Sequence, residues 1–144
     1  MKASLKPGLT HRLAFRVPEE KTVPYLYPES PDFGEMPKVF ATGFMVGLFE
    51  WACIELLKGH LDPGEGSLGV SVAFDHVAAT PPGLTVTVDA ECIAVDGRRI
   101  SFNVRGHDGV DLIGQGRHQR MIVSWDVFSE RVASKARTAG VSLN

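Results

Sequence analysis

The chain has 144 residues, of which 44% are hydrophobic and 22% charged, and its formal net charge at pH 7 is −2. This length suits a single domain over residues 1–144 that buries a substantial core. The near-neutral charge gives no reason to expect nucleic acid or an anionic membrane surface as a partner, and no apolar stretch reaches the length of a membrane span.

The chain opens with a predicted short strand at residues 12–17, where apolar and polar side chains alternate before Pro18. Prolines at 18, 24, 28, 31 and 37 then exclude long regular structure from residues 18–38. This segment nevertheless carries large apolar side chains, among them Phe33 and Met36, which is unusual for a solvated linker. We interpret it either as a flap that closes over a site or as a loop that simply covers the core.

A buried helix is predicted at residues 42–58. Almost every residue from Phe44 to Leu57 is apolar, so the helix has no solvent-facing side. Thr42 precedes the apolar run and is predicted to cap the helix through its hydroxyl. Glu50 is the exception, because a carboxylate inside a core helix costs several kcal/mol unless it is paired, protonated or facing a cavity. Glu50 is therefore a candidate functional acid.

Beyond the helix the hydrophobic period changes to two residues, which predicts four long antiparallel strands joined by hairpins. The first of them covers residues 68–77, where Val70, Val72, Phe74 and His76 share one face. Because this face is apolar, it is predicted to point inwards and to take His76 with it.

Three more strands are predicted near residues 84–92, 100–105 and 110–124, and the turn residues Asp96 and Gly97 join the first two. Residues 126–135 have helical spacing, and residues 137–144 are predicted to be a frayed tail. Antiparallel strands with one polar face need an apolar cover, which only the helix at 42–58 can supply. The predicted fold is therefore α+β, a hot-dog arrangement in which about five strands wrap round one long helix.

A homodimer is also predicted. One helix cannot cover a five-stranded sheet to its edges, and the apolar circumference of this helix exceeds what one sheet can bury. A second copy of the chain would solve both problems.

The two cysteines, Cys53 and Cys92, lie in apolar patterns and are interpreted as reduced core thiols of a cytoplasmic protein. The first residues lack the apolar region of a signal peptide, which agrees with this interpretation.

Glu50 and His76 are the pair of side chains that indicates a catalytic function. Because the predicted fold packs the helix against the strand that carries His76, the two side chains are expected to face one cavity, an arrangement suited to proton transfer or to activating water. Thr42 lies about 12 Å from Glu50 along the helix, so contact between them requires a substrate or a second subunit. His107 and His118 are not at ligand spacing with a pair of carboxylates, and no metal site is predicted.

A series of short motifs is distinctive along the chain. They lie at residues 26–31, 40–47, 50–53, 63–69, 78–88, 95–99 and 107–111. Together they closely resemble the fluoroacetyl-CoA thioesterase family of hot-dog proteins, and the resemblance covers nearly the whole chain.

This resemblance implies hydrolysis of a short-chain acyl-CoA thioester by a homodimer, without any cofactor other than the CoA carried by the substrate. The implied catalytic residues are Thr42, Glu50 and His76, and the implied substrate-binding residues are Gly69, Arg120, Phe33 and Met36. The family has a phenylalanine in the flap where this chain has Met36, so we expect a weaker preference for one acyl group.

Two chemical routes are open for such a reaction. Glu50 either attacks the thioester to form an anhydride or acts as a general base on water, while His76 polarises the water or protonates the departing thiolate. The helix N-terminus and the Gly69 N–H are candidate donors to the oxyanion. Two other functions compete with hydrolysis, namely non-catalytic binding of an acyl-CoA or small ligand and hydration of an enoyl-CoA. A pure binder has no use for a buried Glu50, and the Thr42 motif favours a thioesterase over a hydratase.

Overall fold

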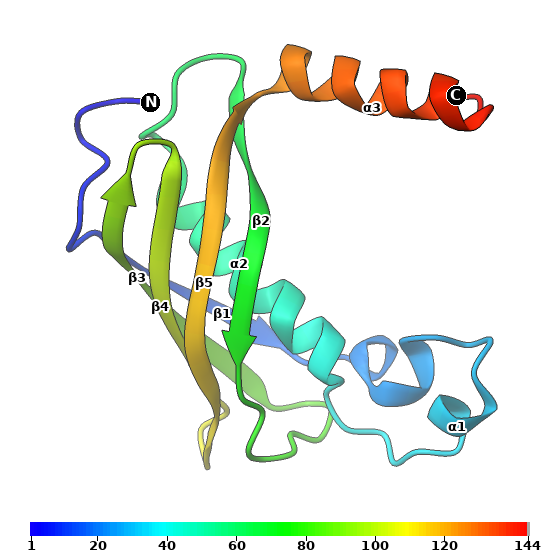
Figure 1. Cartoon of the computed structure of the whole chain (residues 1–144). Coiled ribbons are helices and arrows are strands. Elements are labelled where there is room, and N and C mark those ends of the chain that lie inside the picture. Colours follow the sequence, from blue (N-terminus) through cyan, green and yellow to red (C-terminus); the bar gives the residue numbers. More distant parts are fainter. Residues whose placement is uncertain (144) are drawn as a thin grey trace.

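The computed structural model describes residues 1–143 and consists of one antiparallel sheet, a central helix and a carboxy-terminal helix (Figure 1). The five strands pair in the order β1-β3-β4-β5-β2. Their bounds are β1 Thr10–Arg16, β2 Glu65–Phe74, β3 Thr85–Asp96, β4 Arg99–His107 and β5 Leu112–Ser124. None of the helices in the described part of the chain is long and apolar enough to cross a membrane.

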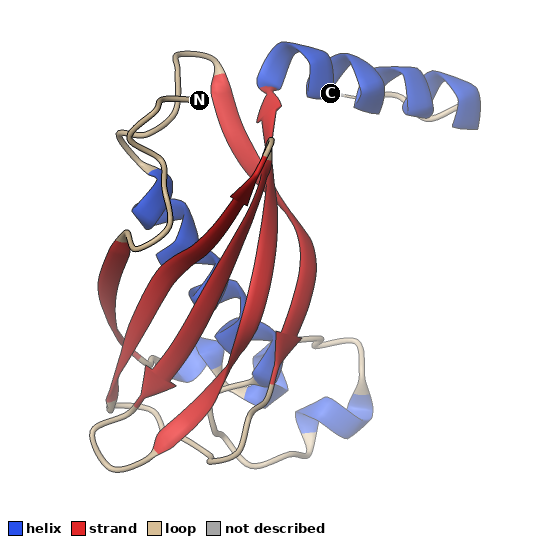
Figure 2. Cartoon of the chain, turned by 60° about the vertical axis from the view of Figure 1, so that its left-hand side comes forward, coloured by secondary structure: helices blue, strands red, loops and turns tan. Residues whose placement is uncertain are grey.

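The central helix, α2, spans Thr42–Leu57 and crosses one face of the sheet (Figure 2). Its buried side chains recur every three or four residues, the spacing of one helix face. They are Met45, Leu48, Phe49, Ala52, Cys53, Leu56 and Leu57. This face packs on the inner side chains of β3 and β4, so the predicted sheet wrapped round one long helix is confirmed.

The strand order corrects one prediction. The four strands after the helix do not form a chain of hairpins, because β2 pairs with β5 and lies at the edge of the sheet, while β3 pairs with β1 and β4. Pro81 and Pro82 prevent a tight hairpin after β2, so the chain crosses the end of the sheet instead. The buried hydroxyl of Thr80 anchors this crossing by donating to the Asp108 carboxylate at 2.8 Å.

The apolar face of β2 is also less covered than predicted. Val70 is 47% exposed and Val72 is 51% exposed, and the strand ends at Phe74 rather than at Val77. A register shift between Gly69 and Ser71 leaves Val70 outside the pairing with β5. Val72 lies opposite the buried His118 in the register with β5, yet half of its own side chain is exposed.

The segment at residues 18–38, called the flap below, contains only short elements, as its prolines predict. These are the 3-10 turns Glu19–Lys21 (η1) and Val23–Tyr25 (η2), and the one-turn helix α1, Pro31–Gly34. The buried Thr22 ties the base of the flap to Phe40 through a β-bridge. The flap therefore lies beside the beginning of α2 (Figure 1).

The carboxy-terminal helix α3, Trp125–Ala139, projects from the end of β5 without burying any of its residues (Figure 1). It continues beyond the predicted 126–135 into the segment expected to be frayed, and it ends at Gly140, whose φ of +71° suits a left-handed cap. The Trp125 ring lies on Gly66 of β2, where an added Cβ would be only 1.9 Å from the indole.

Candidate functional site

Glu50 projects from the middle of α2 towards β5, and its side chain is 34% exposed. Its carboxylate is not isolated, because Oε2 accepts a hydrogen bond from Arg120 Nη1 at 2.9 Å. The predicted functional acid therefore lies at the edge of the core and is stabilised by a buried cation.

The guanidinium of Arg120 is fixed on several sides. Nε donates to the Ser67 hydroxyl at 2.8 Å, and Nη2 donates to the Ser67 carbonyl at 3.0 Å. Nη1 contacts both Glu50 and the Nε2 of His118, the latter at 3.1 Å. Since Ser67 lies on β2 whereas Arg120 and His118 lie on β5, the site depends on the pairing of these two strands.

Gly69 lies opposite Arg120 in the strand register and next to the Glu50 carboxylate. A Cβ added at this position would be 2.6 Å from Glu50 Oε2, closer than such atoms can approach. Any larger residue would force the carboxylate away from the strand. The sequence-predicted residues Glu50, Gly69 and Arg120 therefore form one cluster.

Thr42 and His76 form a second cluster at the beginning of α2. The Thr42 hydroxyl contacts His76 Nδ1 at 2.7 Å. Thr42 is not the helix cap that the sequence predicts, because the cap position is occupied by Ala41 and Thr42 is already helical. The hydroxyl is thereby free to bond the imidazole.

The His76 ring is held in an environment that disfavours its charge. Burial lowers the pKa of His76, while the backbone of Ala78 and the Asp75 carboxylate act in the opposite direction. Its Nε2 is buried and has no hydrogen-bond partner among the described residues. A buried polar atom without a partner is unusual and marks a position where a substrate or water could bind.

The structure does not bring all the predicted residues together within one chain. No hydrogen bond or ion pair in the described part of the chain joins the Thr42–His76 cluster to Glu50. Glu50 lies two helical turns beyond Thr42, and the expectation that Glu50 and His76 face one cavity stays a prediction.

The flap residues lie apart from both clusters. Phe33 stacks on Tyr27 with ring centroids 6.1 Å apart, and Met36 is 45% exposed. The flap touches α2 through Leu26, whose Cδ1 would be 3.0 Å from a Cβ added at Gly43. Leu26 can pack this closely against α2 because Gly43 has no side chain.

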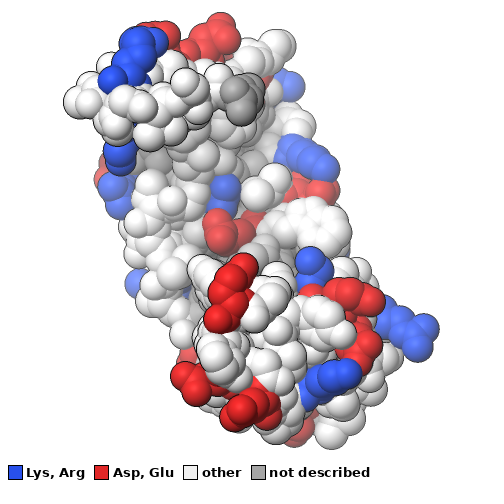
Figure 3. All heavy atoms as spheres, turned by 90° about the vertical axis from the view of Figure 1, so that its right-hand side faces the viewer, with Lys and Arg blue, Asp and Glu red and all other residues white. Residues whose placement is uncertain are grey.

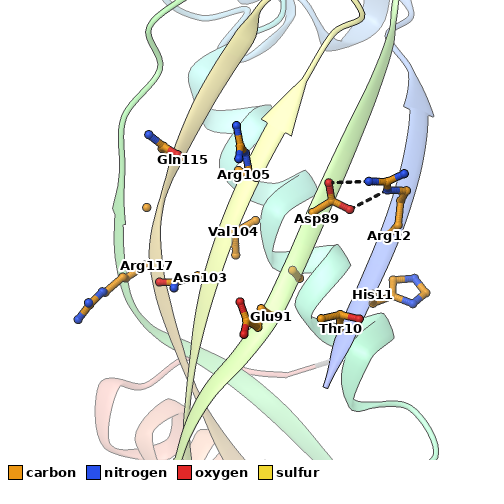
Figure 4. A pocket seen from close by; sticks show the side chains of 12 residues that line it. Thr10, His11, Arg12, Asp89, Glu91, Asn103, Val104, Arg105, Gln115 and Arg117 are labelled. Atoms are coloured by element: carbon orange, nitrogen blue, oxygen red, sulfur yellow. Dashed lines mark hydrogen bonds and ion pairs between the residues drawn. The ribbon is translucent and has the colours of Figure 1, made fainter. Parts of the chain in front are cut away.

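Two hollows of the surface are distinct from the clusters. The larger, of about 790 Å³, lies on the face of the sheet that points away from α2 and is lined by polar side chains such as those of the Arg12–Asp89 ion pair (Figure 4). The smaller, of about 230 Å³, lies between the flap base and α2 and is lined by Lys21, Phe44 and Trp51 among others. None of the sequence-predicted site residues lines either hollow.

Cys53 is the cysteine nearest to Glu50 along α2. Burial raises the pKa of Cys53, one turn beyond Glu50, to about 12, so its thiol is not available as a thiolate nucleophile. In residues 1–143, no group of three or more His, Cys, Asp or Glu side chains is arranged to hold a metal ion.

His118 is the site residue that sequence reasoning missed. It is buried, and it contacts both Arg120 and, through Nδ1, the backbone carbonyl of Ser71. The period-two pattern of the last strand places residues 118 and 120 on one face, and this signal could have linked His118 to the implied role of Arg120.

The chain is similar to known thioesterases over most of its length. Residues 17–126 match the model of the family described as fluoroacetyl-CoA-specific thioesterase. The fluoroacetyl-CoA thioesterase of Streptantibioticus cattleyicolor is 54% identical over 135 residues, which cover 94% of this chain and 97% of that protein.

Two solved structures extend the comparison. A mutant of the fluoroacetyl-CoA-specific thioesterase FlK, in complex with fluoroacetate and CoA, is 56% identical with a TM-score of 0.84, covering 86% of this chain and 99% of that one. A hot-dog-like protein from Thermanaerovibrio acidaminovorans is 23% identical with a TM-score of 0.77 over 90% of this chain and 91% of that one, which shows the shared fold. The chain therefore belongs to the fluoroacetyl-CoA-specific thioesterase family.

Proposed function

We propose that this thioesterase hydrolyses a short-chain acyl-CoA to the free acid and CoA, and that Glu50 is its central catalytic group. The observation that carries this proposal is the Glu50 carboxylate, held beside Gly69 by the buried Arg120 guanidinium. The ion pair fixes the position of the carboxylate oxygen that both candidate routes use.

The chemistry follows one of two routes. In the first, Glu50 removes a proton from water as the water oxygen attacks the thioester carbonyl, and the C–S bond then breaks. In the second, a Glu50 oxygen attacks, the thiolate leaves, and water cleaves the resulting anhydride. In both, neutral His76 either orients the water or takes a proton released from the water and passes it to the departing thiolate. The first amides of α2, which lack intrahelical partners, and the Gly69 N–H are the candidate oxyanion donors.

We further propose that the working unit is a homodimer in which the two clusters come from different subunits. β2 is an edge strand with exposed Val70 and Val72, and the uncovered side of α2 exposes Trp51 and Ile54. Antiparallel pairing of two β2 edges would place the end that leads into His76 beside the beginning of the other β2. The face beside this edge is recessed between the projecting α3 and flap (Figure 3).

The dimer proposal predicts the effect of a charge on the β2 edge. Val72→Asp should shift the protein from dimer to monomer and lower thioester turnover at the same time, because burying an unpaired carboxylate in an interface is costly. Sedimentation equilibrium at micromolar concentration measures the first effect. Val110→Asp, at a 74% exposed position in the β4–β5 turn, is the matched control and should change neither property. A stable native monomer with full activity would refute the proposal.

The acyl preference is proposed to depend on Met36. Methionine fills space without fixing its shape, so the native enzyme should prefer fluoroacetyl-CoA over acetyl-CoA only weakly. Met36→Phe should sharpen this preference by roughly 10-fold, within the ~1–3 kcal/mol that apolar pockets achieve. Specificity constants for acetyl-, fluoroacetyl-, propionyl- and butyryl-CoA measure it, with Tyr25→Phe on the flap as the control. A native enzyme that already prefers fluoroacetyl-CoA by several orders of magnitude would contradict this role.

Release of free CoA thiol from the same panel also tests the function itself. Binding without CoA release would indicate an acyl-CoA-binding protein, and addition of water to an enoyl-CoA would indicate a hydratase. The proposed reaction consumes only water and thioester, so no cofactor is proposed. We also propose a cytoplasmic location, where the free, buried Cys53 and Cys92 would stay reduced.

A further inference from the structure

His118 is a fully buried polar side chain that the proposed reaction does not use. Its relative exposure is 0%, and its ring lies near two aromatic side chains. The ring centroids of Phe74 and Phe102 are 6.0 Å and 6.3 Å away, and Phe102 is nearly parallel to the imidazole at 27°. An apolar ring of the same size could pack in this space, so the two nitrogen atoms need a separate explanation.

The hydrogen bonds of His118 determine its tautomer. Nδ1 lies 2.7 Å from the Ser71 carbonyl oxygen, which can only accept, so Nδ1 carries the hydrogen. In the neutral ring Nε2 is then an acceptor, and it faces Arg120 Nη1 at 3.1 Å. Burial lowers the pKa of His118, and the positive charge of Arg120 lowers it further, against the opposing effects of Ser71 and Glu50. The neutral ring with hydrogen on Nδ1 satisfies every contact.

The Nε2 acceptor restricts the position of the guanidinium. Arg120 Nη1 is shared between Glu50 Oε2 at 2.9 Å and His118 Nε2 at 3.1 Å, while the other nitrogens of Arg120 are held by Ser67. His118 itself is 3.9 Å from the Glu50 carboxylate, too far for a hydrogen bond. It therefore makes no direct hydrogen bond to Glu50 and contacts it through Arg120.

The Nδ1 hydrogen restricts the strand next to the carboxylate. The register of β2 shifts between Gly69 and Ser71. Just after this shift, the Ser71 carbonyl accepts a hydrogen bond from His118 Nδ1 on β5. A Cβ added at Gly69 would be 3.2 Å from His118 Cε1, so the ring also lies against the strand at this glycine. One imidazole thus contacts both the guanidinium and the backbone that surround Glu50.

We propose that His118 is a positioning residue for thioester hydrolysis: its Nε2 orients the Arg120 guanidinium towards Glu50, and its Nδ1–H fixes the Gly69–Ser71 bulge. The inference rests on the proposed function. His118 does not touch the reacting atoms in this arrangement. It differs from an ordinary core residue because Nε2 contacts Arg120 while Nδ1 contacts the Ser71 carbonyl.

Two substitutions separate these tasks. His118→Gln places an amide oxygen near the position of Nε2 and keeps the acceptor for Arg120, whereas His118→Asn places an amide N–H near Nδ1 and keeps the donor to Ser71. We expect His118→Asn to lower kcat about 10-fold with little change in KM, since one misoriented charged hydrogen bond affects the transition state by roughly this factor. His118→Gln should keep kcat within about threefold and raise KM instead, because the bulge beside the substrate is loosened.

His118→Phe, which keeps the ring and loses both hydrogen bonds, should show the kcat loss of the asparagine variant and the raised KM of the glutamine variant. Phe102→Leu disturbs the packing against the same ring without removing a polar contact, and it should leave both constants near native. Thermal unfolding of each variant measures stability in parallel. The inference would be overturned if the glutamine, asparagine and phenylalanine variants all lost kcat equally and in proportion to their loss of stability.

A measurement on the native protein keeps the inference testable if the variants fail to fold. Two-bond ¹H–¹⁵N correlation spectra distinguish the two neutral tautomers of a histidine. We expect hydrogen on Nδ1 of His118, and hydrogen on Nε2 would overturn the proposal, because Nε2 could then not accept from Arg120 Nη1. A native protein that releases no CoA from any thioester would count against the proposed function, whereas a correct tautomer with active but indistinguishable variants would count only against His118.

Discussion

Replacing Glu50 with glutamine should lower thioester turnover by roughly two orders of magnitude or more, the scale expected for a residue that moves a proton or attacks the substrate. The amide keeps the size of the side chain and can still accept from Arg120, so binding of the substrate should change far less than kcat. Steady-state kinetics on a short acyl-CoA, followed by release of free thiol, measures the effect.

Glu55→Gln is a matched control on the same helix. Glu55 bonds the Trp51 indole N–H and the Lys58 ammonium, away from Arg120, and its removal should leave turnover close to native. If Glu50→Gln also kept near-native turnover, Glu50 would be neither nucleophile nor base.

The same substitution should reduce stability. A lone buried carboxylate would make Glu50→Gln stabilising, but the structure pairs Glu50 with a guanidinium that is itself buried. Loss of the anion leaves Arg120 with neutral acceptors only, so the free energy of unfolding should fall by about 1–3 kcal/mol. Urea denaturation measures this difference.

Replacing His76 with alanine should also lower turnover by roughly two orders of magnitude, for a different reason. The imidazole is bonded to Thr42 through one nitrogen, and its other nitrogen is left without a partner among the described residues, which is the arrangement of a group ready to exchange a proton. His60→Ala is the control, since His60 bonds the Ser4 hydroxyl away from this site.

The pH dependence gives the His76 prediction a second readout. Burial lowers the pKa of His76 below the ordinary value of a histidine, so the ring is neutral at pH 7 and gains its proton only at a lower pH. The Asp75 carboxylate is the charged group that opposes this shift. If neutral His76 accepts a proton in the reaction, kcat/KM should decrease as the pH falls through this lowered pKa. The residual activity of His76→Ala should lack that acid limb; an unchanged limb would assign it to another group.

The elements predicted from local pattern match the structure best. The run from Phe44 to Leu57 is apolar at almost every position, which predicts a core helix, and the predicted bounds of 42–58 agree with Thr42–Leu57 within one residue. The prediction that this helix has no solvent-facing side is wrong for the single chain, because Trp51 and Ile54 are exposed. The turn at Asp96 and Gly97 was equally determined, because Gly97 takes the positive φ of +58° that a tight hairpin demands. Both features depend on residues that are neighbours in sequence.

The features that were missed depend on residues far apart in sequence. Alternation shows which side chains share a face, but it does not show which strand lies alongside, and so the pairing of β2 with β5 was not predicted. The partner of Glu50 is 70 positions away in the sequence, and its importance came from the family resemblance rather than from any pattern. His118 was rejected as a metal ligand on spacing alone, and its bond to the Ser71 carbonyl only becomes visible once β5 is placed against β2.

The pairing of β2 with β5 also determines when the site can form during synthesis. β2 leaves the ribosome before β3 and β4, but its partner is the last strand of the sheet to be made. Until residues 112–124 have emerged, β2 has no neighbour, Glu50 has no counter-ion, and the sheet lacks the strand that joins β2 to β4. Such long-range contacts are slow to form and leave apolar surface exposed in the meantime. The nascent chain therefore carries its most apolar helix uncovered for much of its elongation, and a chaperone that recognises exposed apolar segments would meet α2 during this interval.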